Sequence, residues 1–230
     1  MQAKASLHLH TKEDFKDGAL ITYNIKQLID QAVSDNFSVL AITGHEKCVV
    51  QPEHLAYARS RGVLLISGVE LKIRQKHVLV LNCDASVEAI KSLAELSDFK
   101  KNHPEIMVIA PHPNHKKSSL GLRRLEEFKN LFDAIEHSWF YSKIINPNLR
   151  AAAWCQKNKK PFIATSDLHL IEYLNCDYAV LEINSLSVSD VFSAIRENKF
   201  VNISSPKSLT EMIFFGLRLL IQKIELIFKY

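Results

Sequence analysis

Eight short apolar runs, rich in valine, isoleucine and leucine, recur along the chain and constrain its fold more than any other feature. They cover residues 5–9, 38–43, 63–67, 77–82, 106–110, 133–136, 161–165 and 179–183. Stretches with helical spacing lie between them, at residues 23–37, 54–61, 87–99, 122–131, 148–158 and 189–198. This alternation predicts parallel β/α units. The length of 230 residues suits one α/β barrel or one large α/β domain.

Composition excludes several classes of function. The six glycines form neither a GxGxxG nor a Walker loop, which argues against dinucleotide and ATP binding by those routes. The four cysteines are widely spaced, so we expect reduced structural thiols rather than disulfides or a thiolate zinc site. A net charge of +4 is too small to indicate a nucleic-acid binder by itself. The first residues lack a secretory signal and no window is apolar enough to span a membrane, so we expect a cytoplasmic protein.

Histidines and carboxylates stand at the ends of the apolar runs. His8 and His10 are two residues apart, so on a strand they face one side while Leu7 and Leu9 face the other. Further candidates follow in order at the later runs: His45, Glu70, His77, His112, Asp167 and His169. The carboxyl ends of barrel strands surround one mouth, so these distant residues are expected to converge in a single site.

The residue types indicate metal chemistry. Six imidazoles and a few carboxylates, without a thiolate, suit Zn²⁺, Mn²⁺ or Fe²⁺ better than Ca²⁺ or Mg²⁺. The set exceeds the needs of one ion, and two or three ions are expected if Glu70 bridges them. Such ions would lower the pKa of a bound water from 15.7 towards about 7 and would neutralise phosphoryl oxygens. The sequence therefore predicts hydrolysis of a phosphate ester by a metal-bound hydroxide.

Several motifs appear in a characteristic order: HLHT with a later DG, AITGHE, GVE, KHVLVLN, APHP, EH and SDLH. Together they resemble the PHP (polymerase and histidinol phosphatase) family. The resemblance implies an α/β fold, a distorted (β/α)7 barrel, and a trinuclear site. It assigns His8, His10, Glu70 and Asp167 to the first ion, Asp17, His45 and His169 to the second, and Glu70, His77 and His112 to the third.

Two positions leave this ligand set open. Asp17 has the expected distance from His10, but Asp14 is a close competitor. The family usually has Asp before the histidine of its second motif, where this chain has Gly44. We therefore expect His45 to lack an orienting carboxylate and the second ion to bind more weakly, with Gly44→Asp raising the metal content.

Other residues are candidates for substrate contacts. Lys116, Lys117, Arg123 and Arg124 follow His112 and either clamp the substrate phosphate or belong to an ordinary solvated loop and helix. Asp167 and His169 are the candidate proton donors to the leaving group. Of Glu136 and His137, period-two alternation allows only one to face the mouth.

The C-terminal stretch is set apart by its amphipathic pattern. We expect a PHP-type domain over residues 1–206 and an added amphipathic helix over residues 207–230, whose polar residues form one narrow stripe. Its wide apolar face would pack on the barrel, mediate a homo-oligomer or, as the weaker alternative, contact a membrane interface.

Three functions remain open at this point. The first is a phosphatase or phosphoesterase acting on a phosphorylated small molecule or nucleotide. The second is a nuclease acting on oligonucleotide ends, which a basic and aromatic stripe leading to the mouth would support. The third is a catalytically degenerate module that serves binding or scaffolding, which Gly44 and the apolar tail suggest.

Overall fold

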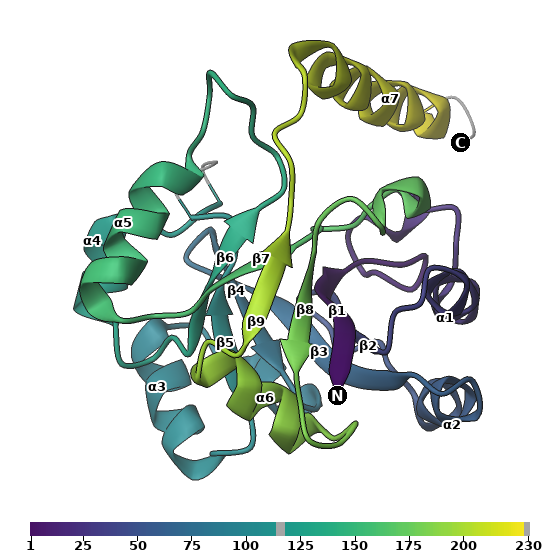
Figure 1. Ribbon diagram of the computed structural model, residues 1–230. Helices are drawn as coiled ribbons and strands as arrows, with labels where there is room; N and C mark the ends of the chain where they lie inside the picture. The colour runs from purple at the N-terminus through teal and green to yellow at the C-terminus, as the bar shows by residue number, and fades with distance from the viewer. Residues whose placement is uncertain (114–117, 228–230) are drawn as a thin grey trace.

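The computed structural model describes residues 1–113 and 118–227, whose strands form one sheet that curls into a nearly closed barrel (Figure 1). The strands are β1 (Gln2–Leu9), β2 (Val39–His45), β3 (Leu64–Ile73), β4 (Lys76–Leu81), β5 (Met107–Ala110), β6 (Ala134–Ser138), β7 (Phe162–Thr165), β8 (Tyr178–Glu182) and β9 (Phe200–Ile203). Their order in the sheet is β7-β6-β5-β4-β3-β2-β1-β8-β9. The expected α/β barrel is confirmed, and β9 is an additional strand that the pattern of apolar runs did not indicate.

Helices surround this barrel and cover its two ends (Figure 1). They are α1 (Ile25–Ser34), α2 (Pro52–Ser60), α3 (Leu93–Asn102), α4 (Leu122–Glu127), α5 (Asn148–Asn158), α6 (Val188–Arg196) and α7 (Leu209–Ile227), with short 3-10 turns η1 (Gly18–Leu20), η2 (Ala85–Ala89) and η3 (Ile171–Tyr173). Local signals set several of their starts. Asn24 and Gln27 form a reciprocal capping box at α1, and the side chains of Ser92 and Ser187 cap α3 and α6.

Not every strand is parallel, which corrects the expectation of uniform β/α units. β4 runs antiparallel to β3 and β5, and β8 runs antiparallel to β1 and β9. The β3–β4 hairpin turns at Arg74 and Gln75, whose φ values of 45° and 66° are both left-handed. Two such residues make the tight turn that suits the twist of a hairpin, although glycine and asparagine are its usual occupants.

A side chain links the two edge strands of the barrel. The Asn202 amide on β9 donates to the carbonyl of Phe162, at 2.7 Å, and accepts from the backbone N–H of Ala164, at 2.8 Å. Both partners belong to β7. This amide and the backbone hydrogen bonds of Leu168 to His8 and His10 take the place of a continuous ladder at the seam, so the barrel is nearly closed.

The barrel interior is apolar at its lower end. Ala5, Val39, Ile66 and Leu79 pack inside it with residues of α6, which covers this end in Figure 1. Separate apolar clusters hold α1 and α2 on one side of the barrel and α3 to α5 on the other. Because the lower end is filled by hydrocarbon, the buried polar residues are confined to the opposite end, where the parallel strands finish.

A bulge in β1 aims its histidines into the barrel. The register between β1 and β2 shifts between Ser6 and Leu9, which inserts one extra residue into β1. Before the shift Leu7 packs in the barrel interior, and after it Leu9 packs outside against α1. Leu7 and Leu9 therefore do not share a face, contrary to the expectation from simple alternation.

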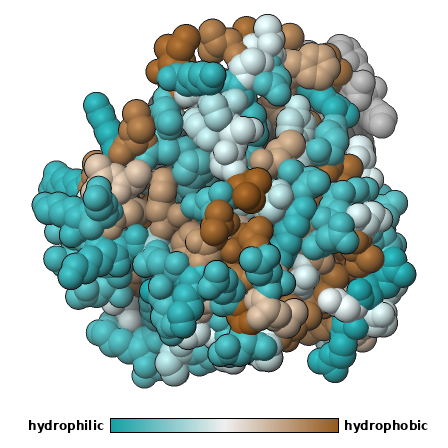
Figure 2. Space-filling view, viewed as in Figure 1, coloured by the Kyte–Doolittle hydropathy of each residue, from teal (hydrophilic) through white to brown (hydrophobic). Residues whose placement is uncertain are grey.

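The last helix, α7, lies across the upper end of the barrel (Figure 1). Phe215 is buried against Trp139, and Arg218 pairs with Glu172. The opposite face of the helix leaves apolar side chains in solvent, including Ile213 and Phe214, both 62% exposed. Figure 2 shows apolar surface along this upper edge. Within the described residues, no helix has the length and hydropathy needed to cross a membrane.

Candidate metal centre

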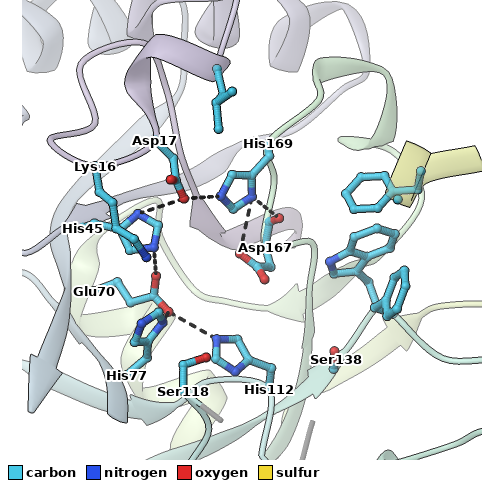
Figure 3. A pocket seen from close by; sticks show the side chains of 15 residues that line it. Lys16, Asp17, His45, Glu70, His77, His112, Ser118, Ser138, Asp167 and His169 are labelled. Carbon is cyan, nitrogen blue, oxygen red and sulfur yellow. Dashed lines mark hydrogen bonds and ion pairs between the residues drawn. The ribbon is translucent and has the colours of Figure 1, made fainter. Parts of the chain in front are cut away.

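All nine predicted ligands meet at the upper end of the barrel, and Figure 3 shows the seven that line the cavity there, which do not include His8 and His10. They come from β1 and the loop after it, from β2, β3 and β4, and from the loops after β5 and β7. They are His8, His10, Asp17, His45, Glu70, His77, His112, Asp167 and His169. The convergence expected from their positions at strand ends is therefore present.

The ring nitrogens of His8 and His10 are spaced for a metal ion. The Nε2 atom of each lies 3.5 Å from Asp167 Oδ1 and 3.6 Å from an oxygen of Glu70. Both Nε2 atoms are buried and lack a hydrogen-bond partner among the described residues. These separations exceed an ordinary hydrogen bond. They are close to the roughly 3.4 Å that separates two ligand atoms around a tetrahedral ion with bonds of 2.0–2.1 Å. The donor set therefore fits a divalent metal.

Glu70 is the centre of the cluster. Its Oε2 lies 3.0 Å from His45 Nε2, while its Oε1 lies 2.6 Å from His77 Nδ1 and 3.2 Å from His112 Nε2. Each carboxylate oxygen thus faces a different group of imidazoles. This is the arrangement that a bridging carboxylate requires, and the shorter distances are those of hydrogen bonds, so an ion there would first displace a proton.

Asp14 accepts hydrogen bonds from the Nδ1–H groups of His10 and His45, on the side of each ring opposite Nε2. The Nδ1–H groups of His10 and His45 donate to its Oδ2, at 2.8 Å and 3.0 Å, and so does the backbone N–H of His45, at 2.9 Å. Its Oδ1 accepts from the backbone N–H groups of Lys16 and Asp17. Asp14 therefore turns both Nε2 atoms into the cluster, which is the role of a carboxylate that orients metal-binding histidines.

Asp17 occupies a different position. Its Oδ2 lies 3.5 Å from His169 Nε2 and 3.9 Å from His45 Nδ1, and its side chain is partly exposed at the cavity. Gly18 makes this loop possible, since a Cβ there would lie 2.4 Å from the Lys12 carbonyl oxygen. The competition between the two aspartates thus has a geometric answer: Asp14 supports the histidines, while Asp17 faces the cavity.

Two further residues orient histidines in the same way. Glu136 on β6 points inward and accepts from His8 Nδ1–H at 2.7 Å, while His137 points outward against Tyr141 and Phe162. His112 Nδ1 lies 3.0 Å from the Ser119 hydroxyl. Strand alternation limited the choice at Glu136 and His137 to one inward residue, but no signal in the sequence marked Ser119.

The structure changes the interpretation of Gly44. This residue lies on the outward phase of β2, and a Cβ there would meet the Lys47 carbonyl oxygen at 3.0 Å and Val49 at 3.2 Å. A carboxylate at this position would point away from the cluster. Because Asp14 already orients His45, the expectation that Gly44 leaves this histidine unsupported is wrong.

Burial and charge act against each other across the cluster. Burial disfavours the charged form of His45, yet Asp14 and Glu70 hold it between two carboxylates and raise its pKa to about 10. Burial also opposes ionisation of Glu70 and Asp167, but the surrounding imidazoles hold the pKa of both well below the usual range. In this fold a proton is therefore held on His45 between two ionised carboxylates, Asp14 and Glu70, and a cation can replace it.

Backbone conformation also serves the site. His112 and Asp167 have φ values of 33° and 43°, in the left-handed region that side chains with a Cβ rarely adopt. Each follows the end of a strand, β5 or β7, and turns its side chain into the cluster. Such local strain is found where surrounding contacts hold a functional residue in place.

Comparison with known proteins agrees with this geometry. A family model described as PHP domain matches residues 6–202. The chain belongs to the PHP family. No curated protein sequence matches the chain significantly.

Solved structures share the PHP fold at low identity. A two-domain protein from Bacteroides vulgatus contains a predicted PHP-like metal-dependent phosphoesterase and is 14% identical to this chain, with a TM-score of 0.69. The match covers 89% of this chain and 65% of that protein. PsfC from Pseudomonas syringae is 13% identical with a TM-score of 0.64, over 96% of this chain and 98% of its own. The lesion-specific endonuclease EndoQ from Pyrococcus furiosus is 14% identical with a TM-score of 0.61, and the match covers 94% of this chain and 66% of the endonuclease.

A cavity of about 380 Å³ opens above the cluster of this PHP domain. Its polar side includes Lys16 and Ser118 beside the predicted ligands (Figure 3), and its other side includes Trp139 and Phe140 after β6 together with Phe215 of α7. Lys16 could not be predicted from the sequence, because a single exposed lysine in a loop carries no signal of its own.

The predicted substrate-binding residues lie elsewhere or outside the described chain. Lys116 and Lys117 fall outside the residues that the structure describes. Arg124 pairs with Glu127 and lines a separate cavity, and Arg123 is exposed on α4. Neither arginine lines the cavity above the cluster, so a role in binding substrate stays a prediction for all four residues.

Proposed function

We propose that this PHP protein hydrolyses a phosphate ester with the help of two or three divalent ions held in the cluster. The carrying observation is the pair of buried Nε2 atoms on His8 and His10, which face Asp167 and Glu70 at separations suited to a shared ion. The mixed imidazole and carboxylate set supports Zn²⁺, Mn²⁺ or Fe²⁺ as the ions. When bound, such ions supply Lewis acidity, lowering the pKa of a coordinated water and neutralising phosphoryl oxygens.

The protein's own residues prepare the site for this chemistry. Asp14, Glu136 and Ser119 fix the ring orientation of the histidines from behind, so the ligand atoms are placed before any ion arrives. Glu70 offers one oxygen to each side of the cluster. Lys16 is exposed at the rim of the cavity, where its ammonium can attract a phosphate without being buried.

The two candidate proton donors differ in position. Asp167 Oδ1 faces both His8 and His10, which supports a ligand role for this carboxylate. His169 lines the cavity, and its Nε2 faces Asp17 at 3.5 Å on the open side of the cluster. We therefore favour His169 over Asp167 as the group that protonates the departing alcohol, because it lies on the open side of the cluster.

The test combines metal content with hydrolysis. Protein stripped with a chelator and reloaded with Mn²⁺ or Zn²⁺ is expected to hold at least two ions and to hydrolyse p-nitrophenyl phosphate. His10→Ala is expected to lose metal and activity, whereas His103→Ala, a control at an exposed histidine far from the cluster, keeps both. Wild-type protein with less than one ion per chain and no hydrolysis would support the degenerate module instead.

The nuclease remains the alternative within the same chemistry. EndoQ shares the fold, but a likeness at 14% identity shows the fold alone. In the described part of the chain, Lys16 is the one lysine or arginine that lines the cavity, rather than a stripe of basic and aromatic residues leading to it. Release of nucleotides from single-stranded oligonucleotides, faster than hydrolysis of p-nitrophenyl phosphate, would favour this alternative.

A further inference from the structure

The helix that follows the PHP domain contributes to the wall of its cavity. The family match ends at residue 202, and α7 begins at Leu209. Phe215 and Gly216 nevertheless line the cavity above the cluster. A segment outside the family match thus contacts the space where a substrate's organic group would lie.

We propose that Phe215 and Gly216 are specificity-determining residues, which select phosphate monoesters whose organic group is a single flat apolar ring. This inference rests on the proposed function, because it assumes that the phosphate binds at the metal cluster. It goes beyond that function by naming the class of alcohol that the site accepts.

Four aromatic residues, Trp139, Phe140, Tyr173 and Phe215, pack against one another and form the aromatic wall of the cavity. Phe215 is 8% exposed, and its ring meets Trp139 at 4.7 Å and Tyr173 at 5.5 Å between centroids, both edge to face. Trp139 in turn meets Phe140 at 5.3 Å. Edge-to-face contacts hold rings in fixed relative orientation. The wall therefore presents a rigid apolar surface rather than loose side chains.

The cavity has two chemically distinct sides. One carries the predicted ligands and Lys16, which suit a phosphate dianion. The other carries Trp139, Phe140 and Phe215, whose rings contact one another. A substrate with its phosphate on the cluster would place its organic group against the aromatic side, where a flat ring gains both apolar burial and ring contacts.

Size limits the choice of substrate. A cavity of about 380 Å³ is at the small end of ligand sites, which span roughly 300–1,000 Å³. The phosphate and one ring would fill much of it. Gly216 lines the cavity and is exposed, and a Cβ there would meet nothing within 4 Å. A larger residue at 216 would therefore be tolerated by the fold and would occupy space near the roof.

The first experiment compares benzyl phosphate with ethyl phosphate, two alkyl esters that differ in the ring. For Mn²⁺-loaded protein, Phe215→Ala is expected to raise KM for benzyl phosphate about tenfold, with kcat retained and ethyl phosphate little changed. Phe214→Ala is the matched control, because Phe214 is the neighbouring ring on the same helix and is 62% exposed. It is expected to match wild type on both esters.

The second experiment adds bulk instead of removing it. Gly216→Leu is expected to raise KM for benzyl phosphate several-fold and to leave ethyl phosphate unaffected, while raising thermal stability because glycine is a poor helix residue. A loss of activity on both esters, or on neither, would overturn the proposal. This variant keeps the test informative if Phe215→Ala loosens the helix.

Binding measurements separate the inference from the proposed function. Benzylphosphonate and ethylphosphonate are titrated into metal-loaded protein, which requires no turnover. If benzylphosphonate binds more tightly than ethylphosphonate, and this preference is lost in Phe215→Ala but not in Phe214→Ala, the result supports the role of Phe215 in specificity even if no ester is hydrolysed. Hydrolysis with equal affinity for both phosphonates would leave the phosphoesterase standing and overturn the specificity assignment.

Discussion

Replacing Asp14 by asparagine tests the role that the structure gives this residue. Oδ2 accepts from the two imidazole N–H groups of His10 and His45 and from one backbone N–H, while Oδ1 accepts from two backbone N–H groups. An amide has one oxygen, so its NH2 must face donors on one side or the other. Asp14→Asn therefore keeps the volume of the side chain but breaks the set of five contacts whichever way the amide turns.

The magnitude follows from these contacts. The amide is expected to turn its NH2 towards Lys16 and Asp17, whose backbone N–H groups are part-buried and have access to water, and to keep its oxygen on the histidines. A buried donor without a partner costs about 1–3 kcal/mol, and access to water puts each of these two donors at the lower end of that range, so the metal-free protein should lose about 2 kcal/mol of unfolding free energy. Loss of an orienting carboxylate should weaken binding of the ions that His10 and His45 would hold by about 10- to 100-fold.

Isothermal titration with Mn²⁺ and urea unfolding of the metal-free protein measure the two effects. Asp17→Asn is the comparison variant, because Asp17 faces the cavity without a comparable set of hydrogen bonds. It is expected to weaken one ion with little loss of unfolding free energy. Wild-type affinity and stability in Asp14→Asn would refute the assignment of Asp14 as the positioning residue.

Three further outcomes are expected. The pKa of His45 is raised from 6.5 to about 10 in the metal-free fold, so protonated His45 stabilises the fold fully below about pH 6.5, and this contribution is lost as the pH rises through about 10. The Tm of chelator-treated protein should therefore fall between these pH values. An equal fall in metal-loaded protein would contradict this account. Gly44→Asp should lower the Tm without raising the metal content measured by mass spectrometry, because its carboxylate would point outward. If the exposed face of α7 mediates self-association, Ile213→Ser with Phe214→Ser should convert an oligomer to a monomer in sedimentation, whereas a monomeric wild type would exclude that hypothesis.

Much of the site could be predicted from local sequence because its residues stand at strand ends. Short β-branched runs identify strands, and polar residues directly after them must lie at one edge of a barrel. This reasoning placed His45, Glu70 and His112 in one site without knowing any contact. It required only that most of the strands run in the same direction.

The register of β1 was not predictable in this way. Simple alternation places Leu7 and His8 on opposite faces, and the bulge after Ser6 brings both to the barrel interior. A bulge depends on the pairing between two strands, so a single strand carries no sign of it. The β3–β4 hairpin was hidden for a related reason, because Arg74 and Gln75 are unusual in a turn that needs two left-handed residues.

By itself, the sequence determined the positions of eight strands along the chain, the family and the group of imidazoles and carboxylates, since each depends on residue types and spacing along the chain. Only the tertiary structure decided that Asp14 supports the histidines while Asp17 faces the cavity, and that α7 places Phe215 above the cluster. The physical reason is that orientation and enclosure depend on distances between segments that are remote in sequence. Those distances arise only when the barrel closes and packs.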